Sequence, residues 1–394
     1  MTETRTISVL GATGSVGAAT LDLIERAQPG AYDVIALTAH TNVDELVRLA
    51  LKFRPTMVAL ADRAGESRLR AALDGKGIEI GCGADAVVEA ARLEADWTMA
   101  AIVGAAGLRP TLAALEQGRA LAFANKECLV CAGGLFMQAA ATAGTELLPV
   151  DSEHNAIFQV FDSRQKKQIE KITLTASGGP FRTWTQDQMR AARRSDALAH
   201  PTWDMGAKIT IDSATMMNKG LEIIEACWLF DLPESQVDVA VHPQSIVHGL
   251  VHYADGSVLS QMGSPDMRTP IANALSWPQR MQAPVAPLDL CAISRLDFET
   301  PDLQRFPAMR LAREAVQQGG ILPAVLNAAN EIAVESFLAE RIGFLEIAGT
   351  VETVMDMSLK DTDMPQQLSS FDDVFAIDHR ARELARELIA VAAA

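Results

Sequence analysis

The first 150 residues alternate short apolar segments with helical patterns, and this alternation constrains the fold more than any other feature. Helical periodicity is clear at Val43–Phe53 and Arg109–Gln117. We expect strands at Ile7–Leu10, Val34–Thr38, Met57–Leu60, Ile78–Gly81, Met99–Val103, Ala120–Phe123 and Thr145–Val150. Strands that alternate with helices form a parallel sheet covered by helices, so we predict a Rossmann-like, doubly wound α/β domain over residues 1–150.

The motif Gly11-Ala-Thr-Gly14-Ser-Val-Gly17 follows the first expected strand and opens a helix that begins near Ser15. Glycines at this spacing allow a tight turn and let the backbone approach a pyrophosphate, which the N–H groups of the helix N-terminus can bind. The alternative is a tight strand–helix turn without a ligand. The position at the start of an α/β domain favours dinucleotide binding.

The end of the second expected strand bears on the choice of dinucleotide. NAD-binding domains often place an Asp or Glu there, which binds the ribose 2′-hydroxyl. Here the loop is His40-Thr41-Asn42, which lacks a carboxylate and offers imidazole, hydroxyl and amide donors. We therefore favour NADP over NAD, although the loop has no Arg or Lys to bind a 2′-phosphate.

Residues 151–276 have a different pattern, which indicates a catalytic α+β domain with some antiparallel pairing. We expect helices at Glu153–Phe161 and Ala214–Phe230, and a hairpin turn at Asp255-Gly256. The expected strands are Ile172–Ala176, Val237–Val241, Ser245–His252 and Ser257–Met262. Residues 178–208 are irregular apart from a short helical pattern at Gln186–Arg193, and a long irregular segment of this kind is typical of a lid.

Residues 277–303 are rich in proline and lack periodicity, so we interpret them as a linker. Helical patterns dominate residues 304–394 and predict a C-terminal helical bundle. The expected helices are Ala308–Gln317, Pro323–Ala339, Leu345–Ser358 and Asp372–Val391.

Charge and cysteine content argue against several classes of protein. The formal net charge of −16 disfavours binding to nucleic acid or to anionic membranes, which requires a basic surface. No signal-peptide pattern is visible, and the longest uncharged stretch, from Cys128 to Thr145, is too weakly apolar for a membrane span. Five scattered cysteines fit a reducing cytoplasm. We interpret the Cys128-x-x-Cys131 pair as part of a core helix rather than a zinc or redox site.

Three carboxylates and a lysine suggest a metal site. Asp151 and Glu153 lie where the last strand of the first domain gives way to a helix. Strand residues two apart share a face, so both carboxylates can point to one ion. Asn218, Lys219 and Glu222 form one stripe on the second expected helix. Carboxylates are ligands that Mg²⁺ and Mn²⁺ prefer. The alternatives are a solvated helix N-terminus for the first pair and a surface ion pair between Lys219 and Glu222.

Two further segments suggest a phosphorylated ligand. Ser177-Gly178-Gly179 is a small-residue turn that can bind an anion, and Ser213 is a candidate helix N-cap and phosphate donor. The segment that contains His200, Trp203 and Met205 can close over such a substrate, with a local packing cluster as the alternative.

Eight segments match the motifs of one enzyme family, in family order along nearly the whole chain. They are Gly11–Gly17, Ala124–Glu127, Val150–Asn155, Ser177–Phe181, His200–Gly206, Ile211–Glu222, His242–His248 and Pro265–Pro270. On these segments the chain resembles the 1-deoxy-D-xylulose 5-phosphate reductoisomerases of the non-mevalonate isoprenoid pathway.

The resemblance implies an enzyme that uses NADPH and one divalent cation, Mg²⁺, Mn²⁺ or Co²⁺. Such an enzyme converts 1-deoxy-D-xylulose 5-phosphate to 2-C-methyl-D-erythritol 4-phosphate by a skeletal rearrangement followed by hydride reduction. The cation would act as a Lewis acid on the C2 carbonyl and the C3 hydroxyl of the substrate. The resemblance also implies a homodimer. We therefore expect a cytoplasmic enzyme with a small sugar phosphate as substrate and with no nucleic-acid or membrane partner.

The matching motifs carry the family's site residues onto this sequence. The metal ligands implied are Asp151, Glu153 and Glu222. The substrate-binding residues implied are Ser152, Ser177, His200, Trp203, Ser213, Asn218 and Lys219, with Met205 also in the lid. The catalytic residues implied are Lys126, Glu153 and His200. The cofactor-binding residues implied are Thr13, Gly14, Ser15, Val16, His40, Thr41, Asn42, Asn125, Lys126, Glu127, Gly206 and Met267.

The chain departs from the family pattern at a few positions. The loop His40–Asn42 stands where the family often has Gly-Lys-Asn or a similar basic residue, Cys128 stands where Ser is usual, and Ala176 stands where Gly is common. None of these changes removes an expected metal ligand, but the first leaves recognition of the 2′-phosphate open.

Three other functions fit parts of the sequence. They are a metal-independent NADP dehydrogenase of another sugar phosphate, an NADP-binding sensor without catalysis, and a metal-dependent isomerase without redox chemistry. The set of three carboxylates argues against the first two, and the Gly11–Gly17 fingerprint argues against the third.

Overall fold

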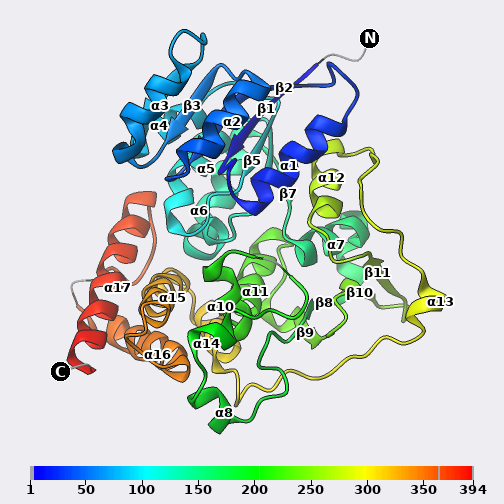
Figure 1. Ribbon diagram of the computed structural model, residues 1–394. Helices are drawn as coiled ribbons and strands as arrows, with labels where there is room; N and C mark the ends of the chain where they lie inside the picture. The colour runs from blue at the N-terminus through cyan, green and yellow to red at the C-terminus, as the bar shows by residue number, and fades with distance from the viewer. Residues whose placement is uncertain (1–3, 204, 363, 393–394) are drawn as a thin grey trace. The chain divides into compact units, whose positions relative to one another are not determined.

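The computed structural model describes residues 4–203, 205–362 and 364–392 (Figure 1). The chain divides into two compact units. The first unit comprises residues 1–128, 136–155 and 266–286, and the second comprises 129–135, 156–265 and 287–394. The domain boundaries predicted at 150, 276 and 303 stay predictions. None of the described helices is long and apolar enough to cross a membrane.

A seven-stranded parallel sheet forms the centre of the first unit, in the order β4-β3-β2-β1-β5-β6-β7. Its strands are β1 (Arg5–Leu10), β2 (Tyr32–Ala39), β3 (Met57–Leu60), β4 (Glu79–Cys82), β5 (Trp97–Ala100), β6 (Ala120–Phe123) and β7 (Glu146–Pro149). All four residues of β3 are buried, as expected for a strand covered on both faces. The predicted doubly wound α/β sheet is confirmed.

Helices connect these strands, and one further helix returns to the unit from later in the chain. They are α1 (Ser15–Arg26), α2 (Val43–Phe53), α3 (Glu66–Leu73), α4 (Ala84–Ala91), α5 (Leu108–Leu115) and α12 (Arg268–Ser276), with the short helices η1 (Arg63–Gly65) and η2 (Ala105–Gly107). Helix α12 packs on α1. The indole Nε1 of Trp97 donates to the Ala274 carbonyl at 3.0 Å, which fixes α12 to the strands.

Two helices contain residues of both units. They are α6 (Glu127–Ala143), which bends at Ala132, and α7 (Ser152–Val160). Cys128 and Cys131 are buried on α6, in agreement with the core interpretation.

A four-stranded mixed sheet forms the centre of the second unit, in the order β11-β10-β8-β9. Its strands are β8 (Ile169–Ala176), β9 (Val237–Val241), β10 (Val247–Tyr253) and β11 (Val258–Met262). The pair β8 and β9 is parallel and the other pairs are antiparallel. The predicted hairpin turn connects β10 to β11, and the Asp255 carboxylate accepts a hydrogen bond from the Ser257 N–H there at 2.9 Å.

Helices surround this sheet and form the C-terminal bundle. They are α8 (Gln186–Arg190), α9 (Arg194–Ala197), α10 (Ala207–Ala214), α11 (Met217–Leu229), α13 (Leu290–Ile293), α14 (Pro307–Gln318), α15 (Leu322–Leu338), α16 (Phe344–Lys360) and α17 (Phe371–Ala392), with η3 (Ser163–Gln168) and η4 (Glu234–Gln236). Helix α15 packs on α14, α16 and α17, so the predicted helical bundle is confirmed.

The single helix expected at Ala214–Phe230 is wrong. Two helices, α10 and α11, replace it, and they meet at Met216, which has a left-handed backbone with φ 61°. Ser213 therefore lies near the end of α10 and is not an N-cap. The segment from Ala207 is already helical, and burial of Met216 and Met217 stabilises a break that no glycine or proline marks in the sequence.

Helix α10 is fixed to the C-terminal bundle by buried polar contacts. The Asn330 amide on α15 donates to the Asp212 carboxylate at 2.8 Å, and Lys208 pairs with the same carboxylate at 2.7 Å. Asp212 and Asn330 are almost fully buried. Buried polar groups of this kind require a partner, so the contact specifies where α10 lies on α15.

Candidate active site

The glycine turn after β1 requires glycine at two of its three positions. Gly11 has a φ of +88°, and a Cβ there would lie 2.7 Å from the Ala101 carbonyl oxygen. A Cβ on Gly17 would lie 2.7 Å from the Cα of Ala12. The Gly11 N–H also donates to the Thr38 hydroxyl at 2.9 Å, so the turn is fixed to the end of β2. This close packing of backbone on backbone explains why glycine is needed at both positions.

The first turn of α1 has free capacity to bind an anion. Its N-cap is Gly14, which has no side chain to accept from the first N–H groups of the helix. Thr13, Ser15 and Val16 lie at the same turn, and Gly14 and Ser15 are exposed. Unsatisfied N–H groups together with the positive end of the helix dipole favour a pyrophosphate.

The loop after β2 is exposed at His40, Thr41 and Asn42. The Asn42 side-chain oxygen caps α2 by accepting from the Glu45 N–H at 3.2 Å. The Asn42 amide group, the Thr41 hydroxyl and the His40 imidazole lie at the carboxyl end of β2, where a doubly wound sheet binds the adenosine ribose.

Two parallel strands bring Lys126 and Asp151 together. Strands β6 and β7 are neighbours, with Phe123 opposite Pro149, and each of the two residues follows the carboxyl end of its strand. The Lys126 Nζ lies 2.7 Å from Asp151 Oδ2, and both side chains are largely buried. A charge in such a position requires a compensating partner, so this ion pair is a fixed part of the site.

Asp151, Ser152 and Glu153 form the start of α7 rather than the end of a strand. Strand β7 ends at Pro149, so the predicted shared strand face is wrong. The Asp151 carboxylate instead accepts from the Glu153 N–H at 3.3 Å, and the Ser152 hydroxyl donates to Glu153 Oε2 at 2.6 Å. The turn still brings a carboxylate oxygen of Asp151 and one of Glu153 within 4.8 Å of each other. Two oxygens at that separation can bind one cation.

Asn125 holds two loops of the first sheet together. Its amide donates to the carbonyls of Ile102 at 2.6 Å and Gly104 at 2.9 Å, and also to Glu127 at 3.1 Å. Asn125 and Glu127 are buried. Their side chains therefore fix the loops after β5 and β6 beside the carboxyl ends of the strands.

In the second unit, the predicted stripe on α11 is present and buried. The Asn218 amide donates to Glu222 Oε1 at 2.6 Å, and Lys219 forms an ion pair with Glu222. Lys219 is 3% exposed and Glu222 is 0% exposed. The surface ion-pair alternative is therefore wrong, because a buried pair with a further hydrogen bond is unusual outside a specific site.

The turn at Ser177 contacts the end of α10. Gly178 and Gly179 have φ values of +84° and +66°, and a Cβ on Gly179 would lie 2.6 Å from the Ser213 carbonyl oxygen. Ser177 and Ser213 are partly buried. The turn and the helix end thus combine small residues and hydroxyls in a way that suits a phosphate.

His200 is bound to this turn as a neutral imidazole. Its Nδ1 accepts from the N–H groups of Thr202 at 3.1 Å and Trp203 at 2.9 Å, so the proton lies on Nε2, which is 3.0 Å from the Ser177 hydroxyl. Burial lowers the pKa of His200 below its ordinary value. The segment after His200 is therefore fixed to the Ser177 turn.

The remaining predicted residues lie in different units. Trp203 lies with its ring 6.4 Å from that of His248, and Met205 is partly buried. Gly206 is the N-cap of α10 in the second unit, whereas Met267 is the N-cap of α12 in the first. Trp203 and Met205 flank a position that lies outside the described residues.

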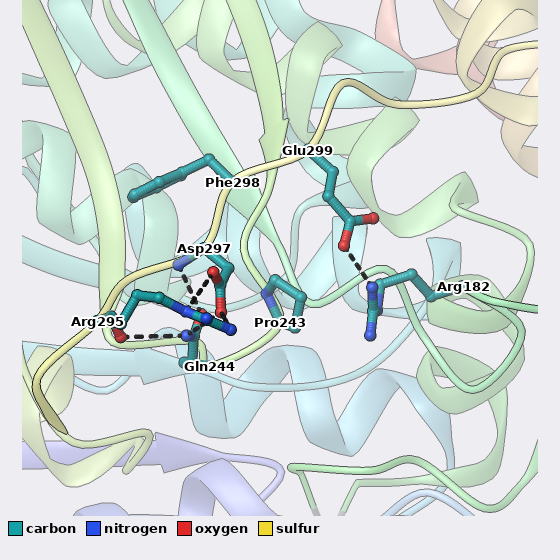
Figure 2. A pocket seen from close by; sticks show the side chains of 7 residues that line it. All are labelled: Arg182, Pro243, Gln244, Arg295, Asp297, Phe298 and Glu299. Atoms are coloured by element: carbon teal, nitrogen blue, oxygen red, sulfur yellow. Dashed lines mark hydrogen bonds and ion pairs between the residues drawn. The ribbon is translucent and has the colours of Figure 1, made fainter.

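A pocket near the Ser177 turn is lined by groups that bind one another (Figure 2). Arg182 pairs with Glu299, and Arg295 pairs with Asp297 at 2.8 Å. The Gln244 amide donates to Asp297 at 2.9 Å. Segment 295–299 joins the end of β9 through an antiparallel bridge between Val241 and Glu299. Because the charged side chains of the pocket pair with one another, we interpret the pocket as the place where this segment packs against β9.

The sequence did not predict the contacts that organise these residues. They are the Lys126–Asp151 pair, the Ser177–His200 hydrogen bond and the Asp212–Asn330 hydrogen bond. Each joins residues that are far apart in the chain, and periodicity reports only local neighbours.

Three family models match consecutive parts of the chain. The model for 1-deoxy-D-xylulose 5-phosphate reductoisomerase matches residues 7–133, the model for its C-terminal domain matches 147–230, and the DXP reductoisomerase C-terminal domain matches 262–384. The 1-deoxy-D-xylulose 5-phosphate reductoisomerase of Rhodospirillum centenum is 57% identical over 386 residues, which cover 98% of this chain and 94% of that protein. The chain belongs to the 1-deoxy-D-xylulose 5-phosphate reductoisomerase family.

Solved reductoisomerases have the same fold. The enzyme from Zymomonas mobilis in complex with NADPH is 52% identical, with a TM-score of 0.91, and the match covers 98% of this chain and 99% of that one. A DOX-P reductoisomerase in complex with NADPH, fosmidomycin and magnesium is 42% identical, with a TM-score of 0.94 and 98% coverage of each chain. The residues expected from the family motifs therefore lie in a chain that matches the reductoisomerases over nearly its whole length.

Proposed function

We propose that this chain is an NADPH- and divalent-cation-dependent reductoisomerase. It converts 1-deoxy-D-xylulose 5-phosphate to 2-C-methyl-D-erythritol 4-phosphate, an early compound of the non-mevalonate isoprenoid pathway. The observation that carries the proposal is the match of nearly the whole chain to reductoisomerases at up to 57% identity. The buried lysine–carboxylate pairs in both units are the chemical groups that such a reaction needs.

The glycine turn fits a bound dinucleotide. Added Cβ atoms at Gly11 and Gly17 would contact backbone atoms, and the N-terminus of α1 offers N–H groups without a side-chain cap. Thr13, Gly14, Ser15 and Val16 would bind the pyrophosphate. NADPH supplies the hydride. Asn125, Lys126, Glu127, Gly206 and Met267 stay predictions for the other contacts to the cofactor.

The carboxylates fit a hard divalent cation. Asp151 and Glu153 offer oxygen ligands within 4.8 Å of each other, and we propose that Glu222 on α11 completes the set. Oxygen ligands alone favour Mg²⁺ or Mn²⁺ over softer metals, and Co²⁺ also accepts them. When bound, the cation supplies Lewis-acid polarisation of the substrate oxygens.

The chain's own side chains orient the substrate. Lys126 pairs with Asp151, and we propose that its positive charge stabilises negative charge that develops on the reacting oxygens. We propose that the Ser152 hydroxyl, which donates to Glu153 in this structure, hydrogen-bonds a substrate hydroxyl in the complex. Lys219 lies beside Glu222 and supplies positive charge for the phosphate.

A remote phosphate anchor provides binding energy that orients the reacting carbons. We propose that Ser177, Ser213 and Asn218 donate to the phosphate, because the first two lie where the glycine turn meets the end of α10. His200 and Trp203 would cover the substrate and exclude water from it. His200 is already fixed to Ser177 by a hydrogen bond, so movement of one affects the other.

We further propose that the enzyme acts in the cytoplasm as a homodimer. The homodimer derives from the family resemblance, and the cytoplasmic location derives from five scattered cysteines that form no disulfide within the described residues. Size-exclusion chromatography with light scattering tests the dimer, and a mass of a single chain at micromolar concentration would contradict it.

The identity of the product tests the proposal. Purified protein is incubated with 1-deoxy-D-xylulose 5-phosphate, NADPH and Mg²⁺, and the product is analysed by NMR. We expect a branched carbon skeleton, formed in a one-to-one ratio with oxidised NADPH. A linear reduced sugar phosphate would instead identify a dehydrogenase without rearrangement, and absence of turnover despite NADPH binding would favour a sensor.

A further inference from the structure

The adenosine end of the proposed NADPH site lacks an obvious positive charge. NADPH differs from NADH by its 2′-phosphate, and NADP-dependent enzymes bind that group with an arginine or a similar cation near the end of the second strand. The loop His40–Asn42 contains no such residue, and the net charge of the chain is −16. A cation that binds the 2′-phosphate would therefore come from a neighbouring element.

Strand β3 ends beside β2 and brings Arg63 to this edge. The two strands are parallel neighbours, with Ala39 opposite Leu60. Their pairing continues beyond the strands, because the N–H of Ala61 donates to the Ala39 carbonyl at 2.9 Å and the N–H of Asp62 donates to the His40 carbonyl at 3.0 Å. Arg63 is the next residue, so its side chain begins one position away from the loop that meets the ribose.

Arg63 differs from the cations within the neighbouring helices α2 and α3 in its lack of a carboxylate partner among the described residues. The cations on α2 and α3 form ion pairs at 2.5 to 3.1 Å, namely Arg48 with Glu45, Lys52 with Glu25, Arg68 with Asp44 and Arg70 with Glu66. Among residues 4–203, 205–362 and 364–392, no ion pair to Arg63 is formed. The acids at the start of α2 are thus neutralised locally, and the Arg63 charge stays available.

The Arg63 guanidinium is exposed and lies against a glycine. A Cβ on Gly83 would lie 2.8 Å from the guanidinium Nε and Nη2 atoms, and Gly83 has a φ of +100°. The Asp62 carboxylate is used elsewhere, since its Oδ1 accepts from the Ala64 N–H at 3.0 Å. Gly83 follows β4, on the side of β3 away from β2, so the Arg63 side chain would have to turn toward the loop, and it has no ion pair within the described residues to break.

We propose that Arg63 selects NADPH over NADH in this chain by binding the 2′-phosphate beside His40, Thr41 and Asn42. The inference rests on the proposed use of NADPH and adds the residue that recognises it. A guanidinium forms strong, two-pronged hydrogen bonds with a phosphate and gains little from the 2′-hydroxyl of NADH. The imidazole, hydroxyl and amide of the loop contribute further hydrogen bonds to the same group.

Direct titration of both dinucleotides tests the role of Arg63. The dissociation constants of NADPH and NADH are measured by nicotinamide fluorescence, without sugar phosphate or metal, for the wild type and Arg63→Ala. We expect Arg63→Ala to raise the dissociation constant of NADPH by roughly tenfold to a hundredfold, which is the range for loss of a charged hydrogen bond. The dissociation constant of NADH should not change. Arg63→Lys should show an intermediate loss, because it keeps the charge but not the two-pronged geometry.

Arg92→Ala is the matched control, because Arg92 is also an exposed arginine of the first unit but pairs with Glu89 at the end of α4, away from the loop His40–Asn42. It should change neither constant, and the thermal unfolding midpoints of all variants should agree. Equal weakening of both dinucleotides by Arg63→Ala, or no weakening, would overturn the inference, as would a wild type without preference for NADPH. If NADPH selectivity depends on Arg63 but no sugar phosphate is turned over, the inference stands and the proposed reaction fails.

Discussion

At the scale of single residues, each unit contains a buried lysine that compensates a carboxylate of the proposed metal set. Lys126 is 6% exposed and pairs with Asp151, and Lys219 is 3% exposed and pairs with Glu222. Removal of one partner from such a pair leaves an uncompensated buried charge, which costs about 3 to 5 kcal/mol. Variants at these positions therefore change stability as well as chemistry, and controls must separate the two effects.

Glu222→Gln should weaken the binding of the metal. The variant replaces a carboxylate ligand by a neutral amide, so we expect the Mg²⁺ concentration for half-maximal activity to rise at least about tenfold. Glu225→Gln is the matched control, because Glu225 is a buried carboxylate on the same helix. The control should leave the Mg²⁺ requirement unchanged even if its thermal unfolding midpoint falls. An equal rise in both variants would show that the effect is structural.

The neutral state of His200 makes part of the stability dependent on pH. Burial lowers the pKa of His200 in the folded protein. When the pH falls below the ordinary value of about 6.5, the unfolded chain therefore takes up a proton before the folded chain does. The contribution of His200 is therefore complete above that value and is lost as the pH falls through the lowered pKa. A protonated ring would also lose the two hydrogen bonds that Nδ1 accepts from backbone N–H groups.

Thermal unfolding midpoints between about pH 7 and pH 5 measure this contribution. His200→Asn should show a smaller fall of the midpoint with falling pH than the wild type. His379→Asn serves as a control, because the side chain of His379 is 74% exposed. If His200→Asn and the wild type have the same pH dependence, protonation of His200 is not linked to unfolding.

At the scale of elements, the turn between β1 and α1 makes different demands on its glycines. Gly17→Ala should lower the thermal unfolding midpoint, since its methyl group would contact the backbone of Gly11 and Ala12 and overpacking of this kind costs about 1 to 3 kcal/mol. Gly14→Ala should be tolerated in the absence of dinucleotide, because its methyl group would lie 3.4 Å from the Gly11 carbonyl oxygen. Equal midpoints for the two variants would contradict the packing seen at Gly17.

Elements with strong local patterns were predictable from the sequence. Strands β3 and β9 and helix α2 have the predicted bounds, because short apolar runs and a capped amphipathic helix are local signals. The break between α10 and α11 was not predictable. Met216 adopts a left-handed backbone that the sequence does not mark, and tertiary burial of this methionine overrides its local preference.

At the scale of the whole molecule, the sequence indicated which residues belong to the site, but it did not indicate which of them contact one another. The motifs around Asp151 and Glu222 indicated a metal and a sugar phosphate. Local pattern offered a helix N-terminus at Asp151 only as an alternative, and it could not indicate that Asp212 bonds to Asn330 at a separation of 118 residues. Such contacts arise from packing of elements that are distant in the chain, and they determine where the chemical groups lie.

Dependence on a divalent cation is the most direct test of the proposed reaction. NADPH oxidation is followed by nicotinamide absorbance with 1-deoxy-D-xylulose 5-phosphate and Mn²⁺, then after EDTA, and again after Mn²⁺ is restored. We predict oxidation only when substrate and metal are both present, with loss in EDTA and full recovery on addition of Mn²⁺. Oxidation that continues in excess EDTA would contradict the account, because the carboxylates of Asp151, Glu153 and Glu222 would then have no metal to hold.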